Sequence, residues 1–137
     1  MNTREFKCVS ILTDMIENHG LIGIKTSFED EGATFNEVLR LKEICNQAKT
    51  KLTLKIGGPE ASRDIQDSAI IGVKGLVAPM VESGFGLTKF INCVNTNLSH
   101  DVIDSLELIV NIETIQVYKN IDEILNINES KDLYALQ

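Results

Sequence analysis

Apolar residues along the chain follow two kinds of spacing, and each kind predicts a different element. Apolar positions that recur every three or four residues predict helices, whereas short apolar runs bounded by glycine, proline or polar residues predict buried strands. We therefore expect helices at residues 5–18, 36–49, 60–71, 84–98 and 115–125. We expect strands at residues 21–28, 51–56, within 72–83, and at 106–112. A turn is expected at His100, and the tail after residue 125 is either a frayed end or the start of another strand.

Strand and helix alternate about four times after the first helix, which is typical of a parallel sheet with right-handed crossovers. The stretch at residues 72–83 is apolar at positions facing both ways, as in a strand covered on both faces. Pro79 has no amide donor, so strand pairing should end near it. The fold class is therefore α/β, with about four βα units and parallel strands preceded by an N-terminal helix.

Length and composition narrow the class of protein. The chain has 137 residues, of which 43% are hydrophobic, enough for one domain over residues 1–137. It is short for a complete (βα)8 barrel, which usually needs ~250 residues. The net charge of -7 argues against nucleic acid or an anionic membrane as partner, and no apolar run is long enough to span a bilayer. The three scattered cysteines indicate reduced thiols in a cytoplasmic protein.

Polar side chains close each of the four predicted strands. They are Glu29, Asp30 and Glu31 after the first strand, Lys55 in the second, Glu82 and Ser83 after the third, and Glu113 and Thr114 after the fourth. Because the carboxyl ends of parallel strands lie at one edge, these groups should converge. Clustered carboxylates repel unless a cation or protons neutralise them, and oxygen ligands suit Mg²⁺ or Mn²⁺. Ordinary solvated loop charges, with Ser83 as a helix cap, are the plainer alternative.

Three segments resemble one known family. Residues 72–83 (GVKGLVAPMVES) are similar to its glycine-rich strand with a Pro-Met-Val turn, and residues 108–114 (LIVNIET) to its Ile-Glu-Thr strand. The latter is followed by residues 120–124 (NIDEI), as on the family's next helix, and residues 28–30 (FED) match more weakly. In this order and spacing, the segments resemble the HpcH/HpaI aldolase and citrate lyase beta-subunit family.

The resemblance implies a fold, a chemistry and a site. The fold would be a (βα)8 barrel, of which this chain is the N-terminal part. The family cleaves or forms carbon–carbon bonds in 2-oxo acid or acyl-CoA substrates, with Mg²⁺ or a similar ion stabilising an enolate. Glu113 would bind the metal, and Glu29 and Asp30 would position water or the ion's ligands. The turn lining the substrate pocket would contribute Pro79, Met80, Glu82 and Ser83.

The chain also departs from the family pattern. Asp30 occupies the place of a histidine found in the aldolase branch, and Lys55 is the nearest cation to the place of a substrate-binding arginine. Lys55 could serve as a Schiff-base lysine, but a counter-ion is the favoured role. The second metal carboxylate has no assigned counterpart. A fragment or a degenerate half-barrel would leave an open sheet edge and an exposed apolar inner face, and should pair with another copy or with the missing half.

These observations leave three interpretations. The first is a carbon–carbon lyase or aldolase that acts on a small molecule. Activity is then expected of the full-length protein, and whether this chain is active alone is left open. The second is a non-catalytic, doubly wound α/β domain that binds or signals. The third is a catalytically dead barrel fragment that serves in assembly.

Overall fold

The computed structural model describes residues 1–137 and contains a five-stranded sheet in which all strands run parallel. The strands are β1 (Gly23–Ser27), β2 (Lys51–Lys55), β3 (Gly75–Ala78), β4 (Glu107–Val110) and β5 (Ala135–Leu136). They lie side by side in sequence order. Sequential order is that of a barrel wall, whereas a doubly wound sheet reverses its order at a switch point. The partial-barrel α/β fold is therefore confirmed, and the doubly wound alternative is wrong.

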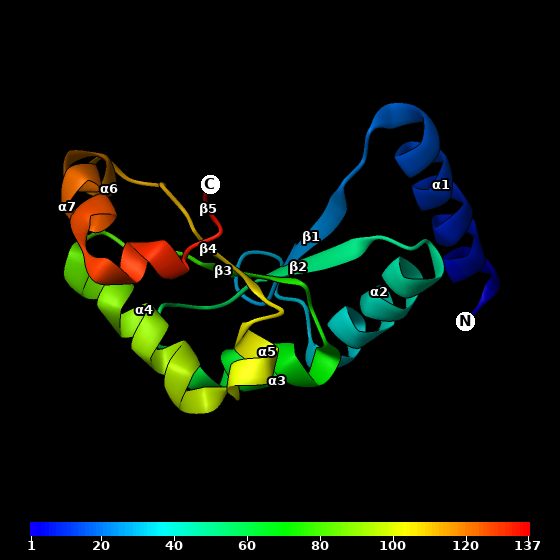
Figure 1. Cartoon of the computed structure of the whole chain (residues 1–137). Helices are drawn as coiled ribbons and strands as arrows, with labels where there is room; N and C mark the ends of the chain where they lie inside the picture. The colour runs from blue at the N-terminus through cyan, green and yellow to red at the C-terminus, as the bar shows by residue number, and fades with distance from the viewer.

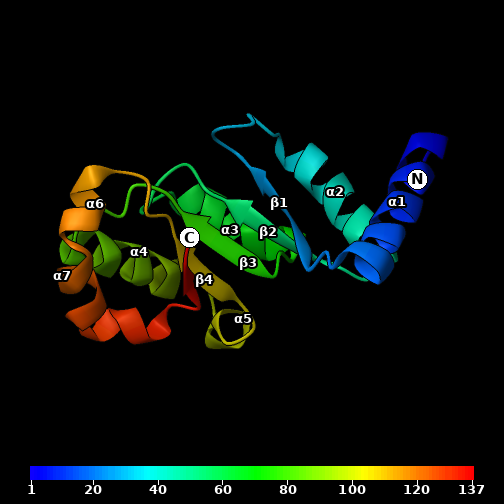
Figure 2. The same cartoon turned by 90° about the horizontal axis from the view of Figure 1, so that it is seen from above.

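Helices connect the strands and cover one face of the sheet, except for the first helix, which precedes β1 and contacts the second. They are α1 (Thr3–His19), α2 (Phe35–Gln47), α3 (Ser62–Ile71), α4 (Gly84–Asn97), α5 (His100–Ile103), α6 (Ile115–Lys119), α7 (Ile121–Asn126) and the 3₁₀ helix η1 (Asn128–Asp132). Figure 1 shows α2, α3 and α4 on one side of the sheet and the C-terminus on the other. Figure 2, turned by 90°, looks onto the face of the sheet opposite α3. We call that open face the inner face.

Local sequence explains where the first helices begin and end. In α1, the Asn2 side chain accepts a hydrogen bond from the Glu5 amide, and the Glu5 carboxylate accepts one from the Asn2 amide. Thr34 and Glu37 make the same reciprocal pair at the start of α2. Such capping boxes satisfy amide donors that the first turn of a helix leaves free. Gly20 ends α1 with a φ of 73°, a conformation that glycine adopts without strain.

The hydrophobic core lies between the sheet and the helices. Leu52 and Leu54 of β2 are fully buried and cluster with Val38 of α2, while Leu76 of β3 clusters with Phe90 of α4. Because side chains alternate along a strand, the residues between these leucines point to the inner face. This alternation determines which side chains of each strand lie on the inner face.

The inner face differs from the expectation of an exposed apolar surface. Its strands present Lys25, Lys51, Thr53, Lys55 and Glu107 at alternating positions. Barrel interiors are usually filled by branched aliphatic residues, so these polar groups correct the prediction in part, while Ile109, Tyr134 and Ala135 keep part of this face apolar. The physical reason is visible in the sequence of β2, in which lysine and threonine alternate with the two buried leucines.

Three further features were missed or only partly predicted. The turn expected at His100 is the short helix α5, and the helix expected at residues 115–125 is divided into α6 and α7 at Asn120. The tail forms η1 and then β5, the second of the two outcomes left open. None of the helices combines the length and apolarity that crossing a membrane would require.

Candidate functional site

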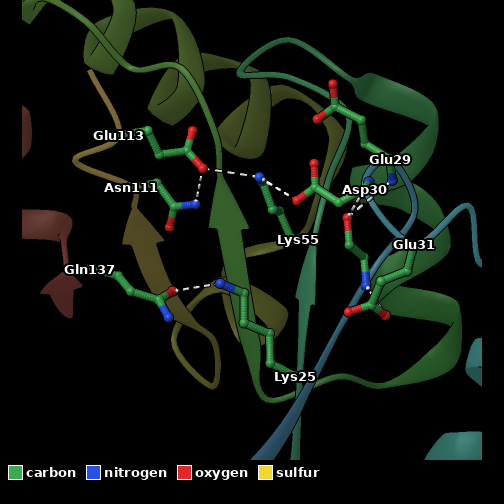
Figure 3. A network of polar contacts seen from close by, with 9 residues as sticks. Lys25, Glu29, Asp30, Glu31, Lys55, Asn111, Glu113 and Gln137 are labelled. Atoms are coloured by element: carbon green, nitrogen blue, oxygen red, sulfur yellow. Dashed lines mark hydrogen bonds and ion pairs between the residues drawn. The ribbon is translucent and has the colours of Figure 1, made fainter. Parts of the chain in front are cut away.

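One buried ammonium group joins two carboxylates at the carboxyl ends of the strands. Lys55 is the last residue of β2, and its side chain is only 7% exposed. Its Nζ lies 2.6 Å from Asp30 Oδ2, just after β1, and 3.0 Å from Glu113 Oε1, just after β4 (Figure 3). The parallel sheet therefore brings together three residues that are separated by up to 83 positions in the chain, since 113 − 30 = 83.

Asn111 extends this group toward the inner face. Its Nδ2 donates a 2.7 Å hydrogen bond to Glu113 Oε1, the oxygen that also accepts from Lys55. Its other side-chain atom, Oδ1, is buried and has no hydrogen-bond partner. A buried acceptor without a partner costs stability, so the atom marks a place where a donor from a ligand or a water would be stabilising.

The contacts shift two pKa values in opposite directions. The hydrogen bond to Asp30 chiefly raises the pKa of Lys55; burial opposes it, and Glu113 adds to the rise. Burial acts to raise the pKa of Glu113, but hydrogen bonds from Asn111 and Lys55, the charge of Lys55 and the Met80 amide together lower it. At neutral pH the site is therefore an ammonium cation held against an ionised Glu113.

The turn after β3 supplies one main-chain group to this site. Met80 has a φ of 56°, which is uncommon for a residue other than glycine. Its amide is one of the groups that lower the pKa of Glu113. Its side chain is 60% exposed, whereas Pro79 before it is buried. The predicted Pro-Met turn thus reaches the site through its backbone.

Glu82 and Ser83 hold neighbouring structure together. Ser83 Oγ accepts a 3.1 Å hydrogen bond from the Gly86 amide as the N-cap of α4, which is the plainer role considered from the sequence. Glu82 Oε1 accepts a 2.7 Å hydrogen bond from Thr114 Oγ1, at the start of α6. These contacts fix the turn beside the site, and a substrate-binding role for either side chain stays a prediction.

Of the three acids after β1, only Asp30 contacts Lys55. The Glu29 carboxylate points away from Lys55 in Figure 3 and makes no ion pair. Glu31 folds back onto β1, where its Oε2 accepts hydrogen bonds from Thr26 Oγ1 at 2.7 Å and from the Ser27 amide at 3.2 Å. A catalytic role for Glu29 stays a prediction without a contact to support it.

A divalent ion was predicted at Glu113, and the donors nearby can be compared with what Mg²⁺ or Mn²⁺ requires. Glu113 and the unpaired Oδ1 of Asn111 are hard oxygen donors of the right kind. No group of three or more His, Cys, Asp or Glu residues is placed to hold a metal ion, and the Lys55 ammonium already contacts Glu113. These residues do not make a divalent-ion site by themselves. The metal assignment stays a prediction.

Sequence reasoning missed two contacts across the inner face. Lys51 Nζ lies 2.6 Å from Glu107 Oε2, which joins β2 to β4. Lys25 Nζ donates a 3.0 Å hydrogen bond to Gln137 Oε1, which spans from β1 to the end of β5 (Figure 3). The alternation in the strands could have placed Lys25 on this face, and likewise Asn111 beside Glu113. Nothing in the sequence identified Gln137.

Comparisons with known proteins agree with this architecture. No family model matches the chain, and neither does any curated protein. One similar solved structure is an HpcH/HpaI aldolase/citrate lyase family protein from Burkholderia cenocepacia, with a TM-score of 0.69 and 10% identity. Another is citrate synthase SbnG, with a TM-score of 0.71 and 13% identity. The chain shares its fold with both.

The two matches cover different shares of the chains compared. They include 88% and 94% of this chain, but only 55% and 58% of the two neighbours, in the same order. The chain therefore spans a little over half the length of each. At this identity the likeness concerns the fold, and the fold predicted from the family resemblance is the part that it confirms.

Proposed function

We propose that this chain supplies part of the active site of a carbon–carbon lyase or aldolase that acts on a 2-oxo acid or acyl-CoA-type substrate. The observation that carries the proposal is the Lys55 ammonium, buried between Asp30 and Glu113 at the carboxyl ends of parallel strands. Barrel enzymes keep their chemistry at this end. The names of the two structural neighbours, an aldolase/citrate lyase family protein and a citrate synthase, both describe carbon–carbon chemistry.

The geometry suggests what Lys55 does in such a reaction. An ammonium has three N–H donors, and two of them are used by Asp30 and Glu113. The third is free to donate to the substrate oxygen that becomes negative when an enolate forms, and this stabilisation is strong where water is excluded. A Schiff base would instead need a neutral amine, whereas the raised pKa keeps Lys55 charged.

Glu113 is the residue proposed to handle the proton. Its lowered pKa keeps the carboxylate ionised at neutral pH, so it can accept a proton from the carbon next to the substrate carbonyl. Asp30 holds the ammonium from the other side at 2.6 Å. The two carboxylates therefore have separate roles, with Asp30 positioning Lys55 and Glu113 facing the reaction.

Enolate formation can be tested without knowing the second substrate. In D₂O, an enzyme that forms the enolate exchanges the methyl protons of pyruvate or acetyl-CoA, and proton NMR follows the loss of signal. We expect exchange above the buffer rate that is lost in Lys55→Met and kept in Lys89→Met, a control that removes an exposed lysine paired with Glu60. If neither compound exchanges faster than in buffer when the full-length protein is assayed with Mg²⁺, with Mn²⁺ or with neither, the proposal is wrong.

A further inference from the structure

The family resemblance implies a divalent ion at Glu113, yet the chain places a cation of its own there. Lys55 Nζ lies 3.0 Å from Glu113 Oε1 and 2.6 Å from Asp30 Oδ2. The Lys55 side chain is buried and belongs to the last residue of β2. The strand therefore holds a positive charge between the two carboxylates, and that charge cannot diffuse away as a bound ion can.

The Glu113 oxygen that faces the ammonium has no free lone pair. Oε1 accepts one hydrogen bond from Lys55 and a second, of 2.7 Å, from Asn111 Nδ2. Asn111 is buried, so its amide donor is held in place. A carboxylate oxygen offers about two lone pairs, which leaves only Oε2 of Glu113 for a metal ion. An ion bound to Oε2 would lie beside the Lys55 ammonium.

The charges of the three groups also disfavour an added ion. Asp30 and Glu113 together carry the two negative charges that one divalent ion would neutralise, and Lys55 already cancels one of them. Even with the full screening of bulk water, repulsion between a unit charge and a double charge about 4 Å apart weakens binding more than about tenfold. No group of three or more His, Cys, Asp or Glu residues is placed to offset this repulsion.

We propose that Lys55 is a built-in cation that takes the place of a divalent ion between Asp30 and Glu113. Both carboxylate oxygens lie within 3.0 Å of Nζ. An Mg²⁺–oxygen bond is about 2.0–2.1 Å, so an ion at the Nζ position would need each oxygen to move by about 1 Å or less. Neutralising Lys55 should therefore open a divalent-ion site. The part this cation plays in catalysis rests on the proposed function, whereas its competition with a metal ion does not.

Mn²⁺ titrations followed by electron paramagnetic resonance test the proposal. Lys55→Gln removes the charge with a shorter side chain and should bind Mn²⁺ at least about tenfold more tightly than wild type. Lys55→Ala should gain affinity as well, although it adds no oxygen ligand. Lys55→Arg keeps a cation and should bind no more tightly than wild type. Combining Glu113→Gln with Lys55→Gln should remove the gain.

Two controls separate this local effect from overall charge and from loss of structure. Lys89→Gln changes the net charge equally at a lysine paired with Glu60, and should leave Mn²⁺ affinity within about twofold. Urea midpoints show that each variant is folded. Wild-type binding at Glu113 tighter than about 0.1 mM, no gain in folded Lys55→Ala, an equal gain in Lys89→Gln, or a gain that survives Glu113→Gln would each overturn the proposal. A failed proton-exchange test beside the expected gain would disprove the proposed function alone.

Discussion

Replacing Lys55 with methionine tests the central ion network directly. Methionine keeps an unbranched side chain of similar length but removes the charge that Asp30 and Glu113 share. Removing one partner of a buried pair costs about 3–5 kcal/mol, whereas an exposed pair contributes about 0–1 kcal/mol. Here the ammonium side chain is 7% exposed, but those of Asp30 and Glu113 are 57% and 33% exposed. We therefore expect a loss of about 2 kcal/mol in the free energy of unfolding.

The two pKa shifts determine how the stability loss in Lys55→Met changes with pH. The raised pKa of Lys55 contributes stability that is present below the ordinary lysine pKa and is lost as pH rises through the folded value. The lowered pKa of Glu113 contributes stability that is present above the ordinary glutamate pKa and is lost as pH falls through the folded value. Both contributions are present at neutral pH, so the difference between wild type and Lys55→Met should be largest there and shrink in acid.

Urea unfolding followed by circular dichroism measures the difference in unfolding free energy between wild type and Lys55→Met, at about pH 7 and about pH 3.5. The matched control is Lys89→Met, whose partner Glu60 is 2.9 Å away but 59% exposed, and it should cost about 0.5 kcal/mol or less. A carbon-13 titration of the Glu113 carboxyl should also show its pKa higher in Lys55→Met than in wild type. Equal losses at both pH values, with the Glu113 pKa unmoved, would refute the electrostatic reasoning.

Two further predictions concern packing and metal binding. A Cβ at Gly75 would lie 2.6 Å from Thr53 Oγ1, so Gly75→Ala should cost about 1–3 kcal/mol in urea unfolding. Gly58→Ala, which meets open space, should be nearly neutral, and Thr53→Ala combined with Gly75→Ala should recover part of the loss; no recovery would contradict the clash. In an electron paramagnetic resonance titration, Mn²⁺ should bind more weakly than about 1 mM, because no complete ligand set surrounds Glu113. Binding tighter than about 0.1 mM that Glu113→Gln abolishes would establish the metal ligand predicted from the sequence.

Several parts of the fold and the site could be predicted because they depend on local patterns. The buried strands and the helices around them follow from apolar spacing, and the parallel arrangement follows from their alternation. Once the strands were parallel, the meeting of Asp30, Lys55 and Glu113 followed from their positions at strand ends. The strand-end rule needs only the direction of each strand, which the sequence supplies.

The remaining features depend on tertiary contacts that local patterns do not encode. Glu29, Asp30 and Glu31 are adjacent and chemically alike, so only the course of the turn decides which one reaches Lys55. The break at Asn120 between α6 and α7 coincides with a hydrogen bond from its side chain to the Glu82 carbonyl, 38 residues away. The strand β5 has two residues, too few for any periodic signal.

The polar lining of the inner face has a consequence for how the chain behaves while it is being made. A nascent chain grows at about 5–20 residues per second, so its first strands meet water for several seconds before later ones exist. An aliphatic face exposed for that time would attract chaperones or other unfinished chains. Here Lys25 of β1 and Lys51, Thr53 and Lys55 of β2 place polar groups on that face from the start. The first two strands therefore carry polar side chains on the inner face before the later strands are made.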